Sequence, residues 1–306
     1  MDLFQLETFL AVAQEGGFSR AAKKLFRTQP AVSQTVRKLE MEVGEALFDR
    51  SSREGVLTDA GRVLQQYAQK LINMREEARG ALDELRQLQA GKLTIAANEF
   101  TSLYLLPLLD EFRRLCPMIK VTVLRSLASR LTEELANHNA ELGVLTFRPD
   151  DPVVRSIVVY RDDLAFVLPP SHPLAGKKEI SIKELGAECF VAHNVPSPYR
   201  VKVIETFKRK RVPLHMDVEL PSIEAIKKFV AKRNGVALLP AICVQDEIDR
   251  GELVGSRVPE LEFERKLRIV YRKNASLSHA AQAFLKVAES FANNKGGRYL
   301  YRPEHS

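Results

Sequence analysis

The sequence has few residues of the kinds that build disulfides, thiolate metal sites or membrane spans. Its 306 residues include three scattered cysteines, Cys116, Cys189 and Cys243, and no CxxC pair, so neither a disulfide framework nor a thiolate zinc site is expected. No apolar run approaches the roughly 18 residues of a transmembrane helix. The first residues, MDLFQLETFL, include Asp2 and lack the basic region of a secretory signal. We therefore expect a reduced, cytoplasmic protein without membrane contact.

Motifs for the common catalytic chemistries are also missing. The sequence contains no GxxxxGK[ST], HExxH, GxSxG or GxGxxG motif. Its six histidines do not cluster, and no spacing suggests a catalytic acid and base. We expect no enzyme activity, no cofactor and no bound metal.

The composition is that of a globular protein of about two domains. Hydrophobic residues make up 45% and charged residues 28%, with a net charge of +7. The first 90 residues are balanced, with 13 Lys and Arg and 13 Asp and Glu. Six basic residues and no acidic residue lie within residues 18–38. Such a window suits contact with phosphates, although a solvated helix face would look the same.

The N-terminal segment carries the pattern of a helix-turn-helix. Apolar residues recur at helical spacing up to Gly16 and Gly17, and again in two later segments. In the third segment the inner stripe includes Val32, Val36 and Leu39. Its outer stripe offers hydrogen-bonding groups and one long cation, which suit base edges. The candidate base-reading residues are Thr28, Gln29, Pro30, Ser33, Gln34 and Arg37.

A small hairpin is predicted next. Two short apolar runs, 47–48 and 56–57, flank a polar turn that ends in Gly55. Such a wing places basic side chains against phosphates or the minor groove. The candidate phosphate or wing contacts are Arg20, Lys38, Arg50, Ser52 and Arg53.

These segments together resemble the winged helix-turn-helix of LysR-type transcriptional regulators. The matches include Gln29-Pro30-Ala31-Val32-Ser33, Leu39-Glu40, Leu47-Phe48 and Leu57-Thr58. Family members often have Arg where this chain has Gln34, which implies a changed base preference rather than lost binding. The resemblance continues to about residue 290.

Thr58 can begin a long helix that reaches about residue 89. Residues three and four apart form an apolar seam of about four heptads. The seam consists of Leu64, Tyr67, Leu71, Met74, Ala78, Ala81, Leu85 and Leu88. One helix packed on its own domain is the alternative. The resemblance implies a linker helix that pairs two DNA-binding heads.

The remaining chain alternates strands and helices in two series. The first starts near residue 93, the second starts near Leu164, and the segments LRIVYRK and SHAAQAFLKVAESF return to the first. This arrangement, with HPLAG (172–176) and GVALLP (235–240), resembles the type-2 periplasmic-binding fold of LysR regulatory domains. The predicted domains are 1–58, 59–90 and 91–292, with lobe I at 92–163 and 265–292, lobe II at 164–264, and a disordered tail over 293–306.

A cleft between such lobes is the expected effector site, because strand ends and helix N-termini meet there. Glu99 would repel an anionic effector unless Arg125, Arg148 or Arg200 neutralises it, and could instead bind an amine. The candidate effector residues are Asn98, Glu99, Thr101, Ser102, Ser126, Ser129, Thr146, His193, Ser197 and Tyr199.

The sequence thus predicts an α/β protein with an N-terminal winged helix-turn-helix that regulates transcription. Its expected partners are a double-stranded operator with an inverted repeat, a small polar effector and further copies of itself in a homodimer or homotetramer. RNA polymerase is a further partner that the resemblance allows. Two alternatives stay open: a small-molecule binding protein whose helix-turn-helix only mediates oligomerisation, and a regulator that senses redox state through a cysteine.

Overall fold

The computed structural model describes residues 1–49, 55–86, 91–195 and 197–304. Contacts divide the chain into two units, each described by itself. The first contains Met1–Gly91 and Glu133–Ala140, and the second contains Lys92–Thr132 and Glu141–Ser306.

The first unit is a helix-turn-helix followed by a long helix. Its helices are α1 (Leu3–Glu15), α2 (Phe18–Lys24), α3 (Gln29–Val43) and α4 (Asp59–Arg86). The Asp2 carboxylate accepts from the Gln5 backbone N–H in a capping box that begins α1, and Gly16 ends it in the left-handed region. Phe9, Val12 and Leu39 are fully buried between the helices. The apolar stripes predicted from helical spacing therefore build one small core.

The base of the predicted wing lies within the described residues. Phe48 and Leu57 form an antiparallel bridge, and the Asp49 N–H donates to the Val56 carbonyl at 2.8 Å. The buried Glu40 carboxylate accepts from the Leu47 N–H at 2.8 Å and so ties α3 to the wing. The Thr58 hydroxyl accepts from the Gly61 N–H at 3.0 Å at the start of α4. The predicted tip residues Arg50, Ser52 and Arg53 lie outside the described residues.

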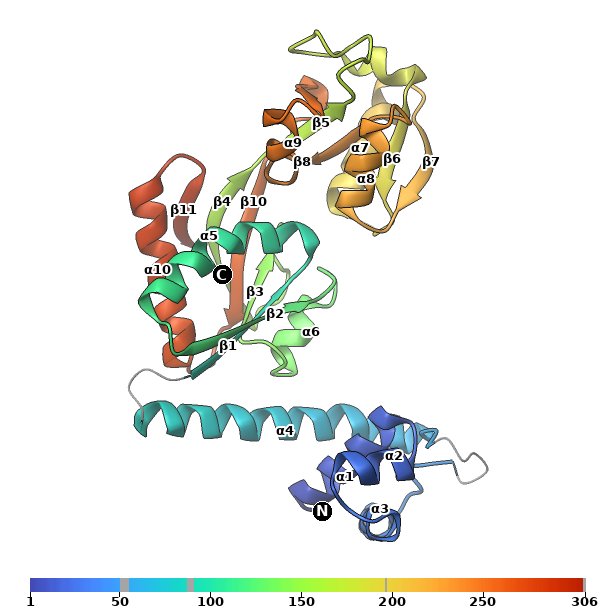
Figure 1. Ribbon diagram of the computed structural model, residues 1–306, viewed down its shortest axis with the longest axis vertical. Helices are drawn as coiled ribbons and strands as arrows, with labels where there is room; N and C mark the ends of the chain where they lie inside the picture. Colours follow the sequence, from blue (N-terminus) through green and yellow to red (C-terminus); the bar gives the residue numbers. More distant parts are fainter. Residues whose placement is uncertain (50–54, 87–90, 196, 305–306) are drawn as a thin grey trace. The chain divides into compact units, whose positions relative to one another are not determined.

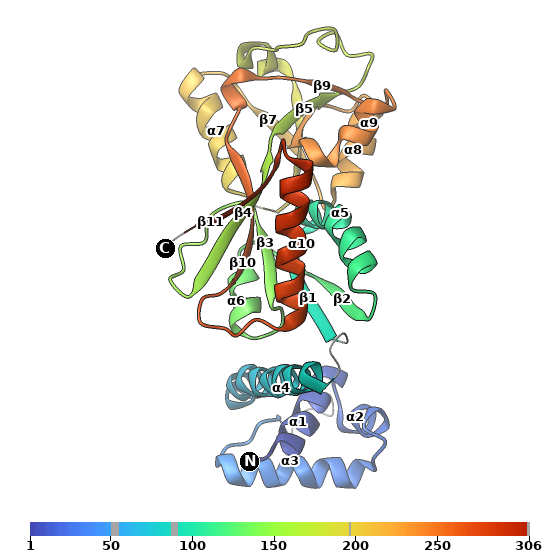
Figure 2. The ribbon, with the colours of Figure 1, turned by 90° about the vertical axis from the view of Figure 1, so that its left-hand side faces the viewer.

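Lobe I of the second unit is built on a six-stranded sheet in the order β11-β4-β10-β3-β1-β2. Its strands are β1 (Gly91–Ala97), β2 (Ile119–Arg125), β3 (Leu142–Leu145), β4 (Val154–Asp162), β10 (Arg265–Arg272) and β11 (Tyr299–Glu304). Helices α5 (Glu99–Leu115) and α10 (His279–Lys295) pack against each other and against the sheet (Figure 2). A short helix, α6 (Leu131–Ala136), precedes β3, and its residues from Glu133 onward belong to the first unit.

Lobe II contains a three-stranded sheet, β8-β5-β9, and a parallel pair, β6 and β7. Its strands are β5 (Leu164–Leu168), β6 (Cys189–His193), β7 (His215–Leu220), β8 (Ala237–Pro240) and β9 (Val254–Ser256). Its helices are α7 (Pro198–Lys210), α8 (Ile223–Ala231) and α9 (Gln245–Asp249), with 3-10 turns η1 (Ile182–Ala187), η2 (Ala241–Cys243) and η3 (Pro259–Leu261). Two apolar clusters, centred on Phe166 and Ile226, form its core.

Two chain passages join the lobes. Strand β4 leads into β5, and the chain returns from lobe II into β10, which runs antiparallel beside β4 (Figure 1). Arg265 at the start of β10 is paired in register with Asp162 at the end of β4. Residues about 100 positions apart in the sequence thus meet where the lobes join.

The prediction of a disordered tail over 293–306 is wrong for the residues described. Helix α10 continues to Lys295, and β11 adds an antiparallel strand beside β4. Tyr299 packs against Tyr104, Tyr160 and Phe291, and Glu304 pairs with Arg268 at 2.8 Å. The polar and glycine-containing composition suggested a disordered terminus. The segment instead forms a strand whose aromatic residues pack against the core of lobe I.

Candidate DNA interface and effector pocket

Helix α3 presents a polar outer face over a buried apolar one. Val32, Val36 and Leu39 are buried in the first unit. The predicted base-reading residues lie on the other side: Thr28, Gln29, Pro30, Gln34 and Arg37 are exposed, and Ser33 is half-buried. A helix that is held by one face and carries amides and a guanidinium on the other can enter a major groove.

Two of the predicted phosphate contacts, Lys38 and Arg20, have exposed side chains. Arg20 in addition makes hydrogen bonds within its own unit. The exposed Arg20 guanidinium donates to the backbone carbonyls of Glu15 and Gly16. Arg20 therefore also holds the turn between α1 and α2, because the carbonyls at a helix C-terminus attract cations.

Helix α4 carries an exposed apolar stripe. Val63, Tyr67, Leu71 and Met74 have relative exposures of 59%, 60%, 42% and 51%, and Ala78 is exposed too. Leu64, by contrast, packs against the core of its own unit. For the predicted seam positions Ala81, Leu85 and Leu88 the structure describes no side chains.

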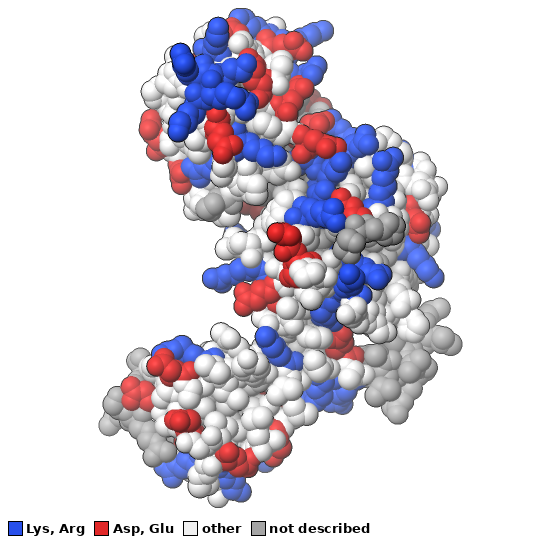
Figure 3. Space-filling model, turned by 180° about the vertical axis from the view of Figure 1, so that it is seen from behind, with Lys and Arg blue, Asp and Glu red and all other residues white. Residues whose placement is uncertain are grey.

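The excess of positive charge belongs to the second unit, since the first 90 residues are balanced. The last turn of α7 carries Lys208, Arg209 and Lys210, all exposed. Figure 3 shows Lys and Arg side chains gathered on lobe II and mixed with Asp and Glu on lobe I. Within the first 90 residues, the six basic residues of 18–38 form a local excess of positive charge.

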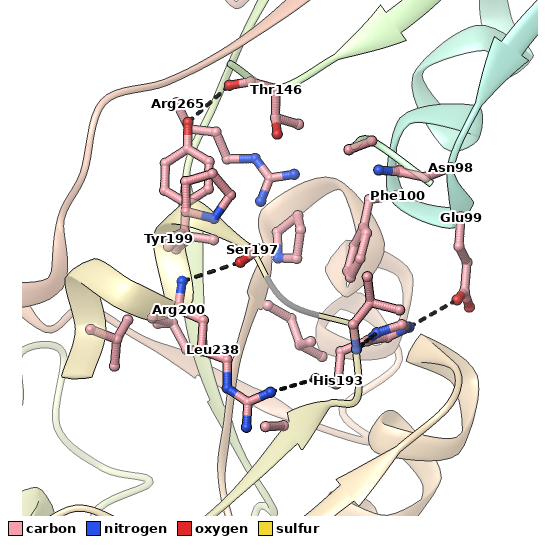
Figure 4. A pocket seen from close by; sticks show the side chains of 18 of the residues that line it. Asn98, Glu99, Phe100, Thr146, His193, Ser197, Tyr199, Arg200, Leu238 and Arg265 are labelled. Atoms are coloured by element: carbon pink, nitrogen blue, oxygen red, sulfur yellow. Dashed lines mark hydrogen bonds and ion pairs between the residues drawn. The ribbon is translucent and has the colours of Figure 1, made fainter. Parts of the chain in front are cut away.

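A cavity of about 810 Å³ lies between the two lobes of the second unit (Figure 4). Strand ends and helix N-termini from both lobes line it, as the sequence predicts. The predicted effector residues that line it are Asn98, Glu99, Ser126, Ser129, Thr146, His193, Ser197 and Tyr199.

Thr101 and Ser102 do not line the cavity, so their prediction as effector contacts is wrong. Thr101 is fully buried and forms a capping box with Asn98 at the start of α5. The Ser102 hydroxyl donates to the Glu99 carbonyl at 2.9 Å. Both hydroxyls serve the helix terminus rather than a ligand.

Hydrogen bonds connect the lobes across the cavity. The Tyr199 hydroxyl at the start of α7 donates to the Thr146 carbonyl in lobe I at 3.0 Å. The Glu99 carboxylate at the start of α5 accepts from the Ile223 N–H of α8 at 2.9 Å and lies 3.4 Å from His193 Nε2 (Figure 4). Glu99 is therefore held by a helix N-terminus and a histidine of lobe II.

Arg125 and Arg200, two of the arginines expected to neutralise Glu99, line the same cavity. Arg200 pairs with Glu219 and donates to the His193 carbonyl at 3.1 Å. The charge of Glu99 is instead balanced at the N-terminus of α8, where backbone N–H groups favour an anion.

Replacement of Glu99 by alanine should loosen the lobes. The Ile223 N–H loses its acceptor, and unfolding of the second unit should become easier by about 1–3 kcal/mol. Calorimetric unfolding measures the change. Glu99→Gln retains an oxygen acceptor and should recover much of the loss, whereas equal losses in both variants would assign no role to that hydrogen bond.

Sequence reasoning missed Arg265, which lines the cavity, and its buried partner Asp162. Arg265 lines the cavity, and its Nε lies 3.0 Å from Asp162 Oδ2. The side chains are 8% and 0% exposed. Burial raises the pKa of the Asp162 carboxyl to about 6, against the opposing effect of the Arg265 guanidinium. No local motif marks this pair, because the two residues meet only through the strand pairing of β4 and β10.

The cysteines are separate free thiols in the structure. Cys243 is buried, and burial raises the pKa of its thiol to about 12, so it stays protonated at neutral pH. Among the described residues no cluster of His, Cys, Asp and Glu could hold a metal ion, and none of the described helices has the length and apolar character of a membrane span.

Comparison with known proteins identifies the family to which this chain belongs. Residues 3–62 match the model of the bacterial regulatory helix-turn-helix protein of the lysR family, and residues 86–292 match the LysR substrate binding domain. The probable RuBisCO transcriptional regulators of Cyanophora paradoxa and Chlorokybus atmophyticus are 32% and 33% identical to this chain, with 92% of it aligned in each case and 89% and 92% of the relatives covered.

Solved structures share the fold over nearly the whole chain. Full-length CbnR complexed with its target DNA has a TM-score of 0.76 at 19% identity, covering 95% of this chain and 99% of the other. A full-length OxyR variant from Pseudomonas aeruginosa has a TM-score of 0.70 at 25% identity, with 94% and 95% covered. The family and its named relatives are regulators rather than enzymes. This chain is a DNA-binding transcriptional regulator of the LysR family, with an N-terminal helix-turn-helix and a C-terminal effector-binding domain.

Proposed function

We propose that this regulator binds an inverted-repeat operator as a homodimer or homotetramer in the cytoplasm, under control of a small polar effector. The observation that carries the proposal is the outer face of α3, where Gln29, Gln34 and Arg37 are exposed above a buried apolar face. Amides and guanidinium groups on such a face read adenine and guanine edges. Arg37, Gln34 and Ser33 are the proposed base contacts, and Lys38 and the wing bind phosphates.

The exposed stripe of α4 supports a paired assembly. Tyr67, Leu71 and Met74 project apolar side chains at helical spacing, and a second copy of the same helix would bury them. Two copies related by a two-fold axis carry two α3 helices, so the operator should contain two inverted half-sites.

The cavity supports control by a small molecule. Its walls come from two lobes that are joined by β4 and β10, so a ligand that contacts both lobes favours one lobe arrangement over others. Effector binding would then shift the population of assemblies with different spacing between the heads. RNA polymerase is the downstream partner in this proposal.

Genomic DNA selection with the purified protein tests the proposal. Fragments retained by the protein are sequenced and compared, and the promoter of RuBisCO genes is a first candidate because relatives are named for that regulation. A few enriched sites that share a dyad would support the operator. Salt-sensitive binding without a shared sequence would contradict sequence-specific regulation.

Replacement of Arg37 by alanine should weaken operator binding by about 1–3 kcal/mol, since one long cation is lost from the groove-facing stripe. Fluorescence anisotropy with the selected site measures the change. Arg113→Ala removes an exposed arginine of the second unit and serves as the matched control. Unchanged affinity in the Arg37 variant would remove Arg37 from the interface.

A further inference from the structure

Arg265 is a buried cation whose hydrogen-bonding capacity is largely unused. Its guanidinium has five N–H donors. Within the described part of the chain, its ion pair is with Asp162, Nε to Oδ2 at 3.0 Å. Neither Nε nor the Asp162 oxygens make a hydrogen bond of good geometry with any described residue. A buried group in this state is costly unless another partner completes it.

The guanidinium is aimed into the cavity. Figure 4 shows it between the rings of Tyr199 and Phe100, below Thr146. Its central carbon lies 5.2 Å from the centre of the Tyr199 ring and 6.0 Å from that of Phe100. These rings hold the planar group by cation–π contact, and the Tyr199 hydroxyl is itself held by the Thr146 carbonyl. The cation is thus fixed in place before any ligand binds.

Glu99, the acidic residue lining the cavity, does not offer its charge to a ligand. Its carboxylate is already bound by the Ile223 N–H and lies beside His193. Arg125 adds positive charge to the lining, whereas Arg200 is paired with Glu219. An ammonium ligand would therefore meet fixed cations, whereas an oxyanion would meet the donors of Arg265.

The rest of the cavity is shaped for an apolar body. Phe147, Leu164, Phe190 and Leu238 are among its lining residues, and its volume of about 810 Å³ exceeds what a lone inorganic ion fills. Figure 4 shows Arg265 beside Thr146 and Tyr199, and Leu238 lower in the cavity among Ser197, His193 and Arg200.

We propose that the effector is an oxyanion, carrying a carboxylate or phosphate group that pairs with Arg265 and an apolar or aromatic body that fills the remaining cavity. This inference rests on the proposed function, because it names the ligand class of the same pocket. Arg265 recognises the oxyanion through its free N–H groups in the bidentate manner of guanidinium. Asp162 remains on the Nε side and competes for the same cation.

Isothermal titration of the full-length protein tests the ligand class with simple probes. Benzoate and phenyl phosphate carry the two kinds of oxyanion on one aromatic ring, benzamide is the neutral counterpart, and benzylamine is the cationic one. At least one anionic probe should bind, and the neutral and cationic probes should bind about tenfold or more weaker. The stronger of the two anions tells a carboxylate from a phosphate.

Variants assign the binding to Arg265. Arg265→Gln should weaken binding of the anionic probe at least about tenfold. Asp162→Asn should strengthen it severalfold, because the competing carboxylate is gone. Arg113→Gln, an exposed arginine of the same lobe, should leave it unchanged. Asp162→Asn/Arg265→Gln removes both buried charges together, so it keeps the test valid if Arg265→Gln alone fails to fold, and it should also lose the anion.

Three results would overturn the inference: no binding of either anion, equal or tighter binding of benzylamine, or full anion affinity in a folded variant without Arg265. Operator binding is measured on the same samples. Intact operator binding with no anion binding would overturn the ligand class alone, and anion binding without any operator would overturn the proposed function alone.

Discussion

Affinity for the selected operator should fall about a thousandfold when the salt concentration rises from about 50 to about 200 mM. If about six phosphates are neutralised, the logarithm of the binding constant falls with the logarithm of salt at a slope near −5. The structure supplies enough cations for this on each first unit, all exposed: Arg20, Lys23, Lys24, Arg27, Arg37 and Lys38. Fluorescence anisotropy at several salt concentrations gives the slope.

A single-charge variant sharpens this measurement. Lys38→Ala should weaken binding similarly for specific and unrelated DNA, and it should make the slope shallower by about 1 for each phosphate that Lys38 neutralises. Arg113→Ala should change neither affinity nor slope, because it belongs to the second unit. A flat salt response of the wild type would favour the alternative in which the helix-turn-helix only mediates oligomerisation.

The second large effect concerns pH and the buried pair where the lobes join. Burial raises the pKa of Asp162 from 3.8 to about 6, so the folded chain holds this proton more tightly than the unfolded chain does. The stabilisation of the fold by protonated Asp162 is complete below about pH 3.8 and is lost as the pH rises through about 6. Relative to Asp162→Asn, the unfolding free energy of the wild type should therefore fall by about 3 kcal/mol between about pH 4 and pH 7.

Urea unfolding of both proteins across this pH range measures the difference, and groups that titrate in both proteins cancel. The charged groups that shift the pKa of Asp162 are Arg265, Asp163 and Arg298. The charge of Asp162 in turn raises the pKa of Tyr199 and of Cys243. Asp110→Asn alters an exposed carboxylate of α5 that is not among the groups acting on Asp162, and it should leave the pH profile of the wild type in place. Parallel profiles for the wild type and Asp162→Asn would contradict the raised pKa.

Helix-scale features were predictable because their signals are local. The apolar spacing of Val32, Val36 and Leu39 places the opposite side of α3 outward, and the buried positions agree. Strand ends followed by helix-capping residues located part of the cavity lining, including Asn98 and Ser197. The same rule failed for Thr101, because a capping hydroxyl at the third helical position turns back to its own helix.

Features that depend on distant pairing were not predictable from local pattern. The aromatic contacts of Tyr299 make a strand of a segment whose composition suggested disorder. The partner of Glu99 is a helix N-terminus in the other lobe rather than an arginine. Neither contact has a trace in nearby sequence, since each joins residues far apart along the chain.

The sequence by itself determined the helix-turn-helix, the outward face of α3 and the α/β character of the larger unit, because apolar periodicity decides which face of an element is buried. Only the tertiary structure decided that Arg265 and Asp162 share a buried site at the cavity. That pairing depends on two crossover strands meeting in register, and burial, which only the fold creates, sets both the raised pKa of the acid and the unused donors of the base.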